Sequence, residues 1–512
     1  MKSLLRQIPL RIFAVFLVAG FNLALVLTAW SAENTSAAGG HGMVVDPGWL
    51  VASHPAEEMP DSLRTTPTQS LTSIYLPMLP HRFRAPTPLL GIAMEAYADS
   101  LGLQEALGLR PRFVRRWQPL SWEAVERVEG QYDWGQLTAL EAELASAYSI
   151  NFEPIIEIQW TPIWARTVPE HVCSAIRADK FEKFADFMEQ VVVRYGSSSP
   201  YGVRYWQLGN EPDVAPDENG GINFFGCWGD PNDPYFGGKH YAEMLKVVYP
   251  RIKAADPEAR VLMGGLLLQC DSETMTVPET CANQQRWLSG KFLEGMLEAG
   301  GGDYFDVADI HSYAVMSSEL PSKMTSIYSW SGPNGGTGIP EKVGFARRIF
   351  ARYGHADKPL LLGEAALKCQ SPTVECNDVA AAFVPRMFAE SYDLKLDGAV
   401  YYLLVADHAY YALMSSDLKP RPAYTSYLAL SEQLSNSIYV GAITEYPGVS
   451  AYEFRQDDGI RHVQIAWSTD GTTQTIVLPA NFVRAFDKYG NLLTPVTGTL
   501  DIGWSPIYLE AQ

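Results

Sequence analysis

Residues 204–213 read Arg-Tyr-Trp-Gln-Leu-Gly-Asn-Glu-Pro-Asp, an apolar run that ends in a short acidic turn sequence. The run Arg204–Leu208 has the composition of a buried strand. A helical pattern precedes it at Lys180–Tyr195, and another follows at Tyr241–Ala255. A strand between two helices of this length is typical of a parallel βαβ unit. The stretch therefore favours an α/β fold with Glu211 at the C-terminal end of a strand.

The same alternation continues outward in both directions along the chain. Apolar runs predict eight strands, at Leu89–Ala93, Phe113–Trp117, Glu153–Gln159, Arg204–Leu208, Arg260–Leu267, Phe305–Ile310, Pro359–Gly363 and Gly398–Leu404. The stretches between them predict helices, at Trp134–Tyr148, Lys180–Tyr195, Tyr241–Ala255, Trp287–Ala299, Pro340–Tyr353 and Val379–Leu394. This pattern predicts a (β/α)8 TIM barrel, in which active sites form at the C-terminal strand ends. A doubly wound open sheet is the alternative, but no glycine-rich phosphate turn follows the first strand.

The helical pattern stops after Leu434. Short apolar runs then predict a small antiparallel β-sandwich, with strands at Ile438–Thr444, Val449–Phe454, Val463–Ser468, Gln474–Leu478, Val483–Phe486 and Ile507–Leu509. We therefore expect a catalytic barrel over residues 86–435 and a C-terminal β domain over residues 436–512.

The N-terminus has the pattern of a secretory signal. Basic residues precede an apolar run from Ile12 to Leu27, and small residues follow it directly. This predicts a signal peptide over residues 1–31, with an uncleaved membrane anchor as the alternative. Residues 32–85 are rich in Ala, Gly, Pro, Ser and Thr and predict a linker or an extended N-terminal segment. We expect a secreted or extracytoplasmic protein that meets a membrane only through an uncleaved N-terminal segment.

The composition restricts the possible partners. Of the 512 residues, 47% are hydrophobic, and the formal net charge is −19. Such a charge argues against nucleic acid as a partner, because binding to phosphates depends on clustered basic side chains. It is compatible with an oligosaccharide or polysaccharide. The sequence has no cofactor motif, and we expect no cofactor.

Six cysteines fit an oxidising destination. The most economical pairing joins neighbours in the sequence and leaves one long-range pair, which gives Cys270 with Cys281, Cys369 with Cys376, and Cys173 with Cys227. Metal binding by these thiols is the alternative. No Cys-x-x-Cys or His-x-x-x-His spacing supports it, so we expect disulfides and no metal site.

Two glutamates follow predicted strands four and seven. Glu211 lies in Asn210-Glu211-Pro212, and Glu364 follows Pro359–Gly363. Strands four and seven lie on opposite sides of a barrel, so their ends can face each other across a bound sugar. Cleavage of a glycosidic bond with retention needs two carboxyl groups about 5–5.5 Å apart. A single glutamate of this kind would be read as an ordinary salt bridge, but the pair favours catalysis.

The two motifs resemble the signature of clan A retaining glycoside hydrolases. The resemblance covers about Pro86 to Leu434 and extends loosely to the β domain. It implies that Glu211 is the general acid/base and Glu364 the nucleophile, and that Asn210 binds the sugar 2-hydroxyl. Two further segments, Trp122–Trp134 and Pro162–Ala165, resemble families 39, 42 and some members of family 5.

The resemblance also implies supporting residues. In His311-Ser312-Tyr313, Tyr313 would donate to Glu364, and His311 would support the acid/base or a substrate hydroxyl; a buried structural histidine is the alternative. An arginine on the second strand would hold the nucleophile. Arg115 and Arg116 are adjacent, and because side chains alternate along a strand only one can point inward. We favour Arg115.

Aromatic residues at the strand ends are candidates for stacking on sugars. We expect Trp160, Trp164 and Tyr402 to bind substrate, with burial in the core as the alternative. Two positions depart from the clan. Tyr401-Tyr402-Leu403 stands where members usually have a tryptophan after strand eight, and Gly209 precedes Asn210 where many have tryptophan.

The function expected from this resemblance is hydrolysis of a β-linked glycan through a covalent glycosyl-enzyme intermediate. The similarity to family 39 favours an exo-acting β-xylosidase. An endo-acting glucanase or mannanase is the nearer alternative, depending on how the loop from Asp213 to Gly238 closes the groove. Transglycosylation and a non-catalytic carbohydrate-binding protein are the others.

Overall fold

The computed structural model describes residues 89–149, 152–216, 226–277, 279–406, 410–456, 459–495 and 498–512. They belong to one structural unit, Arg84–Gln512. The predicted signal peptide and the predicted linker lie outside the described residues. Within the described ranges, no helix combines the length and apolar character needed to cross a membrane.

Nine strands form one sheet in the order β5-β4-β3-β2-β1-β9-β8-β6-β7. All pair in parallel except β7, which pairs antiparallel with β6. The ends of the parallel order meet, because β5 and β6 form parallel bridges at Leu262–Val307 and Leu266–Ile310. The eight parallel strands thus close into a barrel. The strands are β1 Leu90–Met94, β2 Phe113–Ser121, β3 Glu153–Gln159, β4 Tyr205–Asn210, β5 Arg260–Gly265, β6 Ala308–Met316, β7 Met324–Ser326, β8 Leu360–Lys368 and β9 Gly398–Tyr401.

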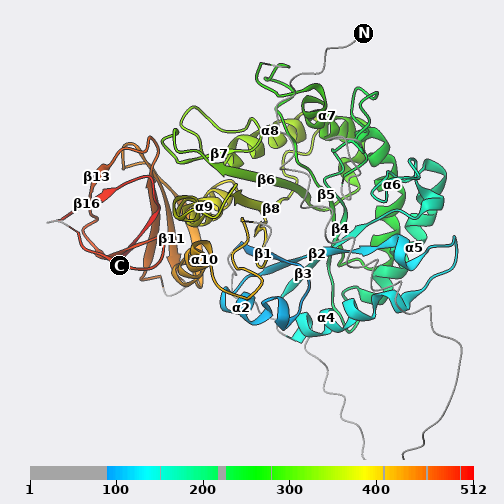
Figure 1. The fold of residues 1–512 in the computed structure, drawn as a ribbon, viewed down its shortest axis with the longest axis horizontal. Helices are drawn as coiled ribbons and strands as arrows, with labels where there is room; N and C mark the ends of the chain where they lie inside the picture. Colours follow the sequence, from blue (N-terminus) through cyan, green and yellow to red (C-terminus); the bar gives the residue numbers. More distant parts are fainter. Residues whose placement is uncertain are drawn as a thin grey trace, which may run out of the picture. The chain divides into compact units, whose positions relative to one another are not determined.

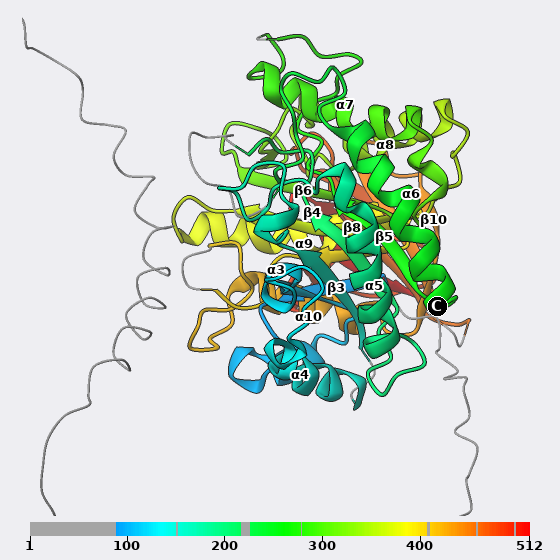
Figure 2. The ribbon, with the colours of Figure 1, turned by 90° about the vertical axis from the view of Figure 1, so that its right-hand side faces the viewer.

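Helices connect these strands and surround them (Figure 1; Figure 2). The α-helices of this part are α2 Leu103–Gly108, α3 Trp122–Val125, α4 Thr138–Ser149, α5 Phe181–Tyr195, α6 Gly238–Ala255, α7 Gln284–Glu298, α8 Ile339–Arg352, α9 Val374–Asp393 and α10 Pro422–Gln433. Short 3-10 helices lie at Asp99–Leu101, Trp134–Leu137, Ile163–Ala165, Ala178–Lys180 and Gly301–Asp303.

The residue pattern explains this layering. Strand β1 is buried along its whole length, as a parallel strand is when side chains fill the barrel on one face and helices cover the other. Helix α5 buries Phe184, Phe187, Val191 and Tyr195, whose spacing places them on one side of the helix. The helix layer and the barrel therefore share one hydrophobic core.

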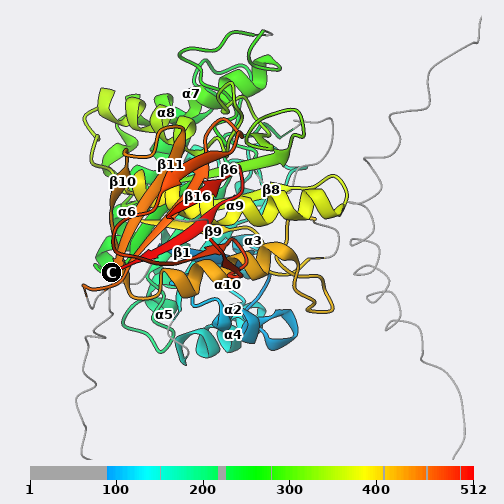
Figure 3. The same cartoon turned by 90° about the vertical axis from the view of Figure 1, so that its left-hand side faces the viewer.

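The C-terminal part is antiparallel (Figure 3). A six-stranded sheet has the order β10-β11-β12-β17-β14-β15, and β13 pairs with β16 in a second sheet. Apolar side chains from both sheets, among them Ile476, Ile502 and Leu509, form a separate small core. The strands are β10 Ser437–Ile443, β11 Val449–Gln456, β12 His462–Ser468, β13 Gln474–Val477, β14 Phe482–Asp487, β15 Leu492–Leu493, β16 Thr499–Ile502 and β17 Ile507–Ala511. The fold is a TIM barrel followed by an antiparallel β-sandwich, which confirms the predicted fold class.

Two barrel strands are longer than the sequence pattern indicated. Strands β6 and β8 pair with each other from Ala308–Leu360 to Val315–Lys368, and β7 extends the edge of β6. His311, Tyr313 and Glu364 therefore lie within strands, whereas the sequence pattern placed them just after strands. The sequence pattern ended these strands too early, because polar residues interrupt their apolar runs.

Candidate active site

Glu211 is the first residue after β4, and its backbone is fixed by neighbouring strands. Its N–H donates to the carbonyl of Gly265, at the end of β5, over 2.9 Å. Its φ of +49° lies in the left-handed region, which is uncommon for a residue with a side chain and is often found at active sites. Two residues on, the buried Asp213 carboxylate accepts hydrogen bonds from the N–H groups of Leu267 and Leu268 at 3.0 and 2.7 Å. This turn is therefore tied firmly to the loop after β5.

Glu364 lies within β8 at an irregularity in the sheet. The register of β8 against β9 shifts between Leu362 and Ala365. Just before the glutamate, the N–H of Gly363 donates to Asp309 Oδ1 at 2.8 Å. A Cβ at Gly363 would lie 2.2 Å from that oxygen, so this position needs glycine. The irregularity helps to direct the Glu364 side chain into the barrel.

The two carboxylates and one histidine form a compact group. One oxygen of Glu211, one oxygen of Glu364 and a ring nitrogen of His311 all lie within 4.8 Å of one another. His311 Nδ1 is 2.9 Å from Glu211 Oε1 and 3.5 Å from Glu364 Oε2. All three side chains are buried. The approach of one oxygen of each carboxylate to within 4.8 Å is compatible with the separation of about 5–5.5 Å that retaining glycosidases use.

Arg115, on β2, connects the nucleophile candidate to three other inward-facing groups. Its guanidinium donates to Glu364 Oε1 and Glu157 Oε2, both at 2.7 Å, and to Gln207 Oε1 and Asn210 Oδ1, both at 2.8 Å. Burial by itself lowers the pKa of Arg115, but Glu364 and Glu157 raise it above its ordinary value. Arg115 therefore remains charged and holds four strands in one arrangement.

The environment of Glu364 favours its ionised form. Burial alone raises the pKa of this carboxyl, but His311, Arg115 and the Tyr313 hydroxyl outweigh it and lower the pKa below its ordinary value. The Tyr313 hydroxyl donates to Glu364 Oε2, while Arg115 occupies Oε1. Both oxygens are therefore held in place, as a charged nucleophile requires.

Two further acids lie behind this group. Burial raises the pKa of Glu157 to about 7, although Arg115 opposes the shift. Burial likewise raises the pKa of Asp309 to about 6, against the effect of His311. Near neutral pH these two carboxyls are partly protonated, which limits the negative charge that surrounds Glu364.

His311 is held by a close backbone approach. A Cβ at Gly265 would lie 1.9 Å from His311 Nε2, so only glycine leaves room for the ring. The backbone carbonyl of His311 accepts a hydrogen bond from Lys342 Nζ at 2.6 Å. Burial lowers the pKa of His311, but Glu364, Glu211 and Asp309 raise it above its ordinary value. A protonated His311 would offset the charge of the two catalytic candidates.

The other predicted residues are distributed differently. Tyr402 follows β9, and its ring lies edge-on to Tyr313 with centroids 6.1 Å apart. Arg116 points away from this group and pairs with Glu143 at 2.7 Å. Trp164 packs edge-on against Trp122 beside α5, outside the carboxylate group.

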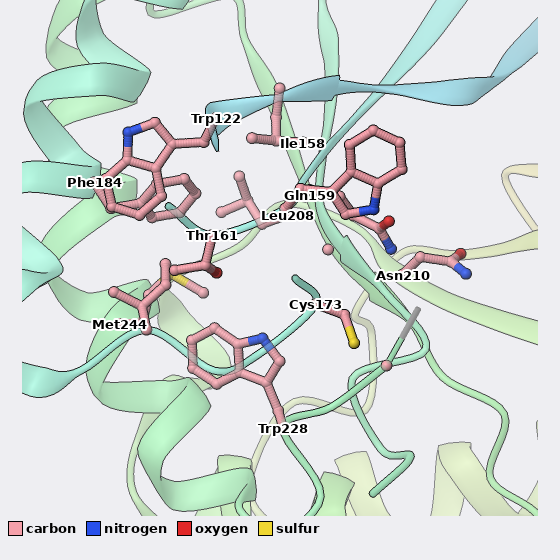
Figure 4. Close-up of a pocket in the computed structure, with 14 residues that line it drawn as sticks. Trp122, Ile158, Gln159, Thr161, Cys173, Phe184, Leu208, Asn210, Trp228 and Met244 are labelled. Atoms are coloured by element: carbon pink, nitrogen blue, oxygen red, sulfur yellow. The ribbon is translucent and has the colours of Figure 1, made fainter. Parts of the chain in front are cut away.

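Trp160 and Asn210 adjoin a small apolar cavity beside the ends of β3 and β4 (Figure 4). The cavity is about 40 Å³ in volume and includes neither Glu211 nor Glu364 among its lining residues. In Figure 4 the Asn210 amide points away from the apolar side chains, among them Trp122 and Trp228. A volume of this size has room for a water molecule or two but not for a whole sugar ring. The carboxylate pair, rather than this cavity, therefore defines the site.

Sequence reasoning missed Glu157, Gln207, Asp309 and Lys368. A usable signal existed for the first, because Glu157 is the charged residue in the middle of the otherwise apolar run Pro154–Ile158. A charge in a strand that is buried on both faces needs a partner, and partners collect where strands converge. No comparable signal points to Lys368, which ends β8.

Three disulfides join loops at the C-terminal ends of strands. Cys173 with Cys227 joins the loop after β3 to the loop after β4. Cys270 with Cys281 closes a loop after β5, and Cys369 with Cys376 closes the turn between β8 and α9. This is the predicted pairing. All three therefore strengthen the side of the barrel that carries the candidate site.

Glu211, His311 and Glu364 also form the group in the described part of the chain that could hold a metal ion. Their contacts favour another role. Arg115 and Tyr313 already donate to both oxygens of Glu364, and His311 Nδ1 contacts Glu211. The carboxylates are thus arranged as hydrogen-bond acceptors for neighbouring side chains, and both oxygens of Glu364 are already occupied.

Comparison with solved structures places the fold. A family 39 glycoside hydrolase from Bacteroides cellulosilyticus WH2 is 21% identical, with a TM-score of 0.62, and the match covers 83% of this chain and 81% of that one. A monomeric β-xylosidase from Caulobacter crescentus CB15 is 15% identical, with a TM-score of 0.53 and coverage of 84% and 98%. A conserved exported protein from Bacteroides fragilis is 11% identical, with a TM-score of 0.58 and coverage of 83% and 98%.

Sequence comparison adds no closer relation. No family model matches the chain, and no curated protein matches it. The likeness to solved structures is therefore one of fold, the barrel and β-sandwich arrangement of clan A glycoside hydrolases.

Proposed function

We propose that the protein is a retaining glycoside hydrolase in which Glu364 is the nucleophile and Glu211 the general acid/base. The observation that carries this proposal is the buried pair of carboxylates, of which one oxygen of each lies within 4.8 Å of the other beside His311. Inverting enzymes keep the two carboxyl groups about 6.5–9.5 Å apart to admit a water molecule. The shorter separation supports direct attack by a carboxylate.

The contacts suggest which carboxylate has which role. Glu364 is held at both oxygens by Arg115 and Tyr313, so it stays ionised and oriented for attack on the anomeric carbon. Glu211 contacts His311 and, in the contacts described above, receives no arginine. It is therefore the better candidate to give a proton to the leaving oxygen.

The reaction then follows in two steps. Glu364 forms a bond to the anomeric carbon as the glycosidic bond breaks, and Glu211 protonates the departing oxygen. A water molecule next gives its proton to Glu211 and displaces Glu364, which restores the free carboxylate. Asn210 is fixed by Arg115 at 2.8 Å and is placed to bind a hydroxyl next to the anomeric carbon.

The substrate class proposed is a β-linked glycan outside the cytoplasm. A solved structure of similar fold is that of a β-xylosidase, which supports a β-linked glycan as the substrate. The three disulfides form readily in an oxidising compartment, which supports export. Residues 217–225 of the loop that would close the groove lie outside the described residues.

Azide rescue of two variants tests the proposed roles. We expect Glu364→Ala to lose at least about 1,000-fold in kcat on a glycoside with an activated leaving group. Azide should restore turnover of this variant and give a glycosyl azide of inverted configuration, because azide replaces the missing nucleophile in one displacement. In Glu211→Ala, azide should give the retained configuration, because the glycosyl-enzyme still forms.

The exposed Glu258→Gln variant is the matched control and should keep wild-type kinetics. NMR of the first-formed anomer from the wild type should show retention. An initial product of inverted configuration, or full activity in Glu364→Ala, would overturn the proposal.

A further inference from the structure

Lys368 lies on the same strand as Glu364, four residues further toward the barrel rim. Residues four apart on a strand share a face, so both side chains face the barrel mouth. The lysine backbone is fixed on two sides, since it pairs with Val315 on β6 and precedes the disulfide of Cys369. Its position is therefore set as firmly as that of the proposed nucleophile.

The ammonium group of Lys368 is surrounded by aromatic rings. Nζ lies 4.1 Å from the ring centroid of Tyr313 and 5.4 Å from that of Tyr411. The side chain is only partly exposed, and within the described ranges its ammonium has no hydrogen bond or ion pair to an oxygen. The buried Lys342 is different, because its Nζ donates to the carbonyls of Leu267 and His311 at 2.7 and 2.6 Å.

Among the described residues, no carboxylate forms an ion pair with this ammonium. Of the described acids, Glu211 and Glu364 stabilise the charge of Lys368, but neither pairs with it directly. Glu364 is held by Arg115 and Tyr313, and Glu211 by His311. Burial lowers the pKa of Lys368, against the effects of Glu211 and Glu364, because a partly buried ammonium is less well hydrated than an exposed one. A partly buried cation without a direct ion-pair partner is stabilised further by a ligand that brings its own negative charge.

The location indicates what the ligand would be. The Tyr313 side chain contacts Glu364 through its hydroxyl and Lys368 through its ring face, so nucleophile and ammonium border the same space. A sugar whose anomeric carbon faces Glu364 would bring its other ring substituents toward Lys368. The neutral pentose of a β-xyloside would leave the ammonium without a counter-charge. A ring carboxylate would supply both the charge and a charge-assisted hydrogen bond.

We infer that Lys368 is a specificity residue that binds the carboxylate of a uronic acid, so that the glycan cleaved is an acidic one. This inference rests on the proposed glycosidase function and refines its substrate. Tyr313 and Tyr411 form the aromatic walls that hold the ammonium toward the sugar.

A matched substrate series tests the inference. The 4-nitrophenyl β-glucuronide, β-glucoside, 6-sulfated β-glucoside and β-xyloside present a carboxylate, no charge, a sulfate and no substituent at the same ring position. We expect the wild type to have its highest kcat/KM on the glucuronide. Lys368→Met should lower the glucuronide-to-glucoside ratio of kcat/KM about 10- to 100-fold, the effect of one charge-assisted hydrogen bond.

Lys419→Met, at a lysine that is 80% exposed and paired with Asp417, is the control and should leave the ratio unchanged. If Lys368→Met lowers kcat/KM equally on charged and neutral glycosides, the lysine acts on the carboxylates and the inference is wrong. Preference for the sulfated glycoside over the glucuronide would also overturn it, because the anion would then be a sulfate ester.

Failure of the inference can be told apart from failure of the proposed function. A wild type that cleaves neutral glycosides and ignores the glucuronide keeps the function and loses the inference. If no glycoside is cleaved, calorimetric binding of glucuronic acid and glucose to the full chain decides. Selective binding of the acid that Lys368→Met removes would support the inference, and equal or absent binding would overturn it.

Discussion

Two buried arginines, one in the barrel mouth and one at the interface with the β domain, have different kinds of partner. Arg115, in the mouth, donates to Glu364 and Glu157 and has amide partners as well. Arg386, on α9, donates instead to the carbonyl of Trp504 in the β domain, and its Nε has no partner within the described ranges. Its guanidinium lies 5.4 Å from the ring centroid of Trp467.

The pKa values of the two arginines shift in opposite directions. In the mouth, Glu364 and Glu157 outweigh burial and raise the pKa of Arg115. At the interface, burial outweighs Glu390 and lowers the pKa of Arg386 to about 10. Beside Arg386 and Glu390 lies a polar cavity of about 170 Å³ between the barrel and the β domain. In the mouth, carboxylates compensate the buried cation and fix the groups around it. At the interface, the buried cation mainly joins two parts of the chain.

Replacing Arg115 should have the largest effect. Arg115→Met leaves two buried carboxylates without their cation, so we expect a loss of about 3–5 kcal/mol in unfolding free energy and no measurable turnover. Urea unfolding and glycoside hydrolysis check this. Arg115→Lys keeps the charge and should fold, yet lose activity because one ammonium cannot reach four acceptors. Wild-type activity in Arg115→Lys would show that Arg115 contributes only its charge, and would contradict the contrast with Arg386.

Removing the tyrosine hydroxyl should have a smaller effect. Tyr313→Phe removes a donor to ionised Glu364, so kcat should fall about 10- to 100-fold. The hydroxyl is among the groups that lower the pKa of Glu364. Its loss raises that pKa, and the acidic limb of the pH profile of kcat/KM should move to higher pH. An unmoved acidic limb would show that Tyr313 acts on folding alone.

Changing the interface arginine should affect stability but not catalysis. Arg386→Met leaves the carbonyls of Trp504 and Ser322 without their donor, which should cost about 1–3 kcal/mol in unfolding free energy. We expect kcat/KM to stay within twofold of the wild type. A large fall in kcat at temperatures where the variant is folded would mean that the β domain takes part in catalysis.

The smallest effect concerns Glu390. Burial raises its pKa to about 7, against the effects of Thr337 and Arg386. The folded state therefore binds a proton that the unfolded state releases, and the contribution to stability is largest at low pH and declines as pH rises toward 7. Glu390→Gln mimics the protonated form and should flatten this decline between about pH 4.5 and 7 in Tm measurements. An unchanged slope would show that Glu390 is already ionised in the folded protein.

Much of the architecture followed from local patterns. Alternating apolar runs and helical stretches predicted the barrel, and the end of the helical pattern after Leu434 predicted the β-sandwich that begins with β10. The same reading predicted no strand at β7, β15 or β16, because such short strands give little periodic signal.

The candidate site was predictable in its parts and not in its arrangement. The two glutamates stood out because each directly follows an apolar run, at the fourth and the seventh predicted strands. Alternation allowed only one of Arg115 and Arg116 to point inward, and the structure directs Arg115 there and Arg116 to Glu143. The roles assigned to these residues stay predictions until the variants are measured.

The sequence by itself determined the fold class and the two glutamates that follow apolar runs, because each depends on periodicity or spacing along the chain. For the cysteines it offered only the most economical of fifteen pairings, which the structure contains. Only the tertiary structure decided which groups meet in the mouth. The irregularity between Ile310 and His311 and that between Leu362 and Ala365 set which side chains face inward, since a shift of one residue turns a strand's side chains to the other face. Barrel closure then brings Arg115 to Glu364 across 249 positions of sequence and leaves Lys368 above them, contacts that no local pattern encodes.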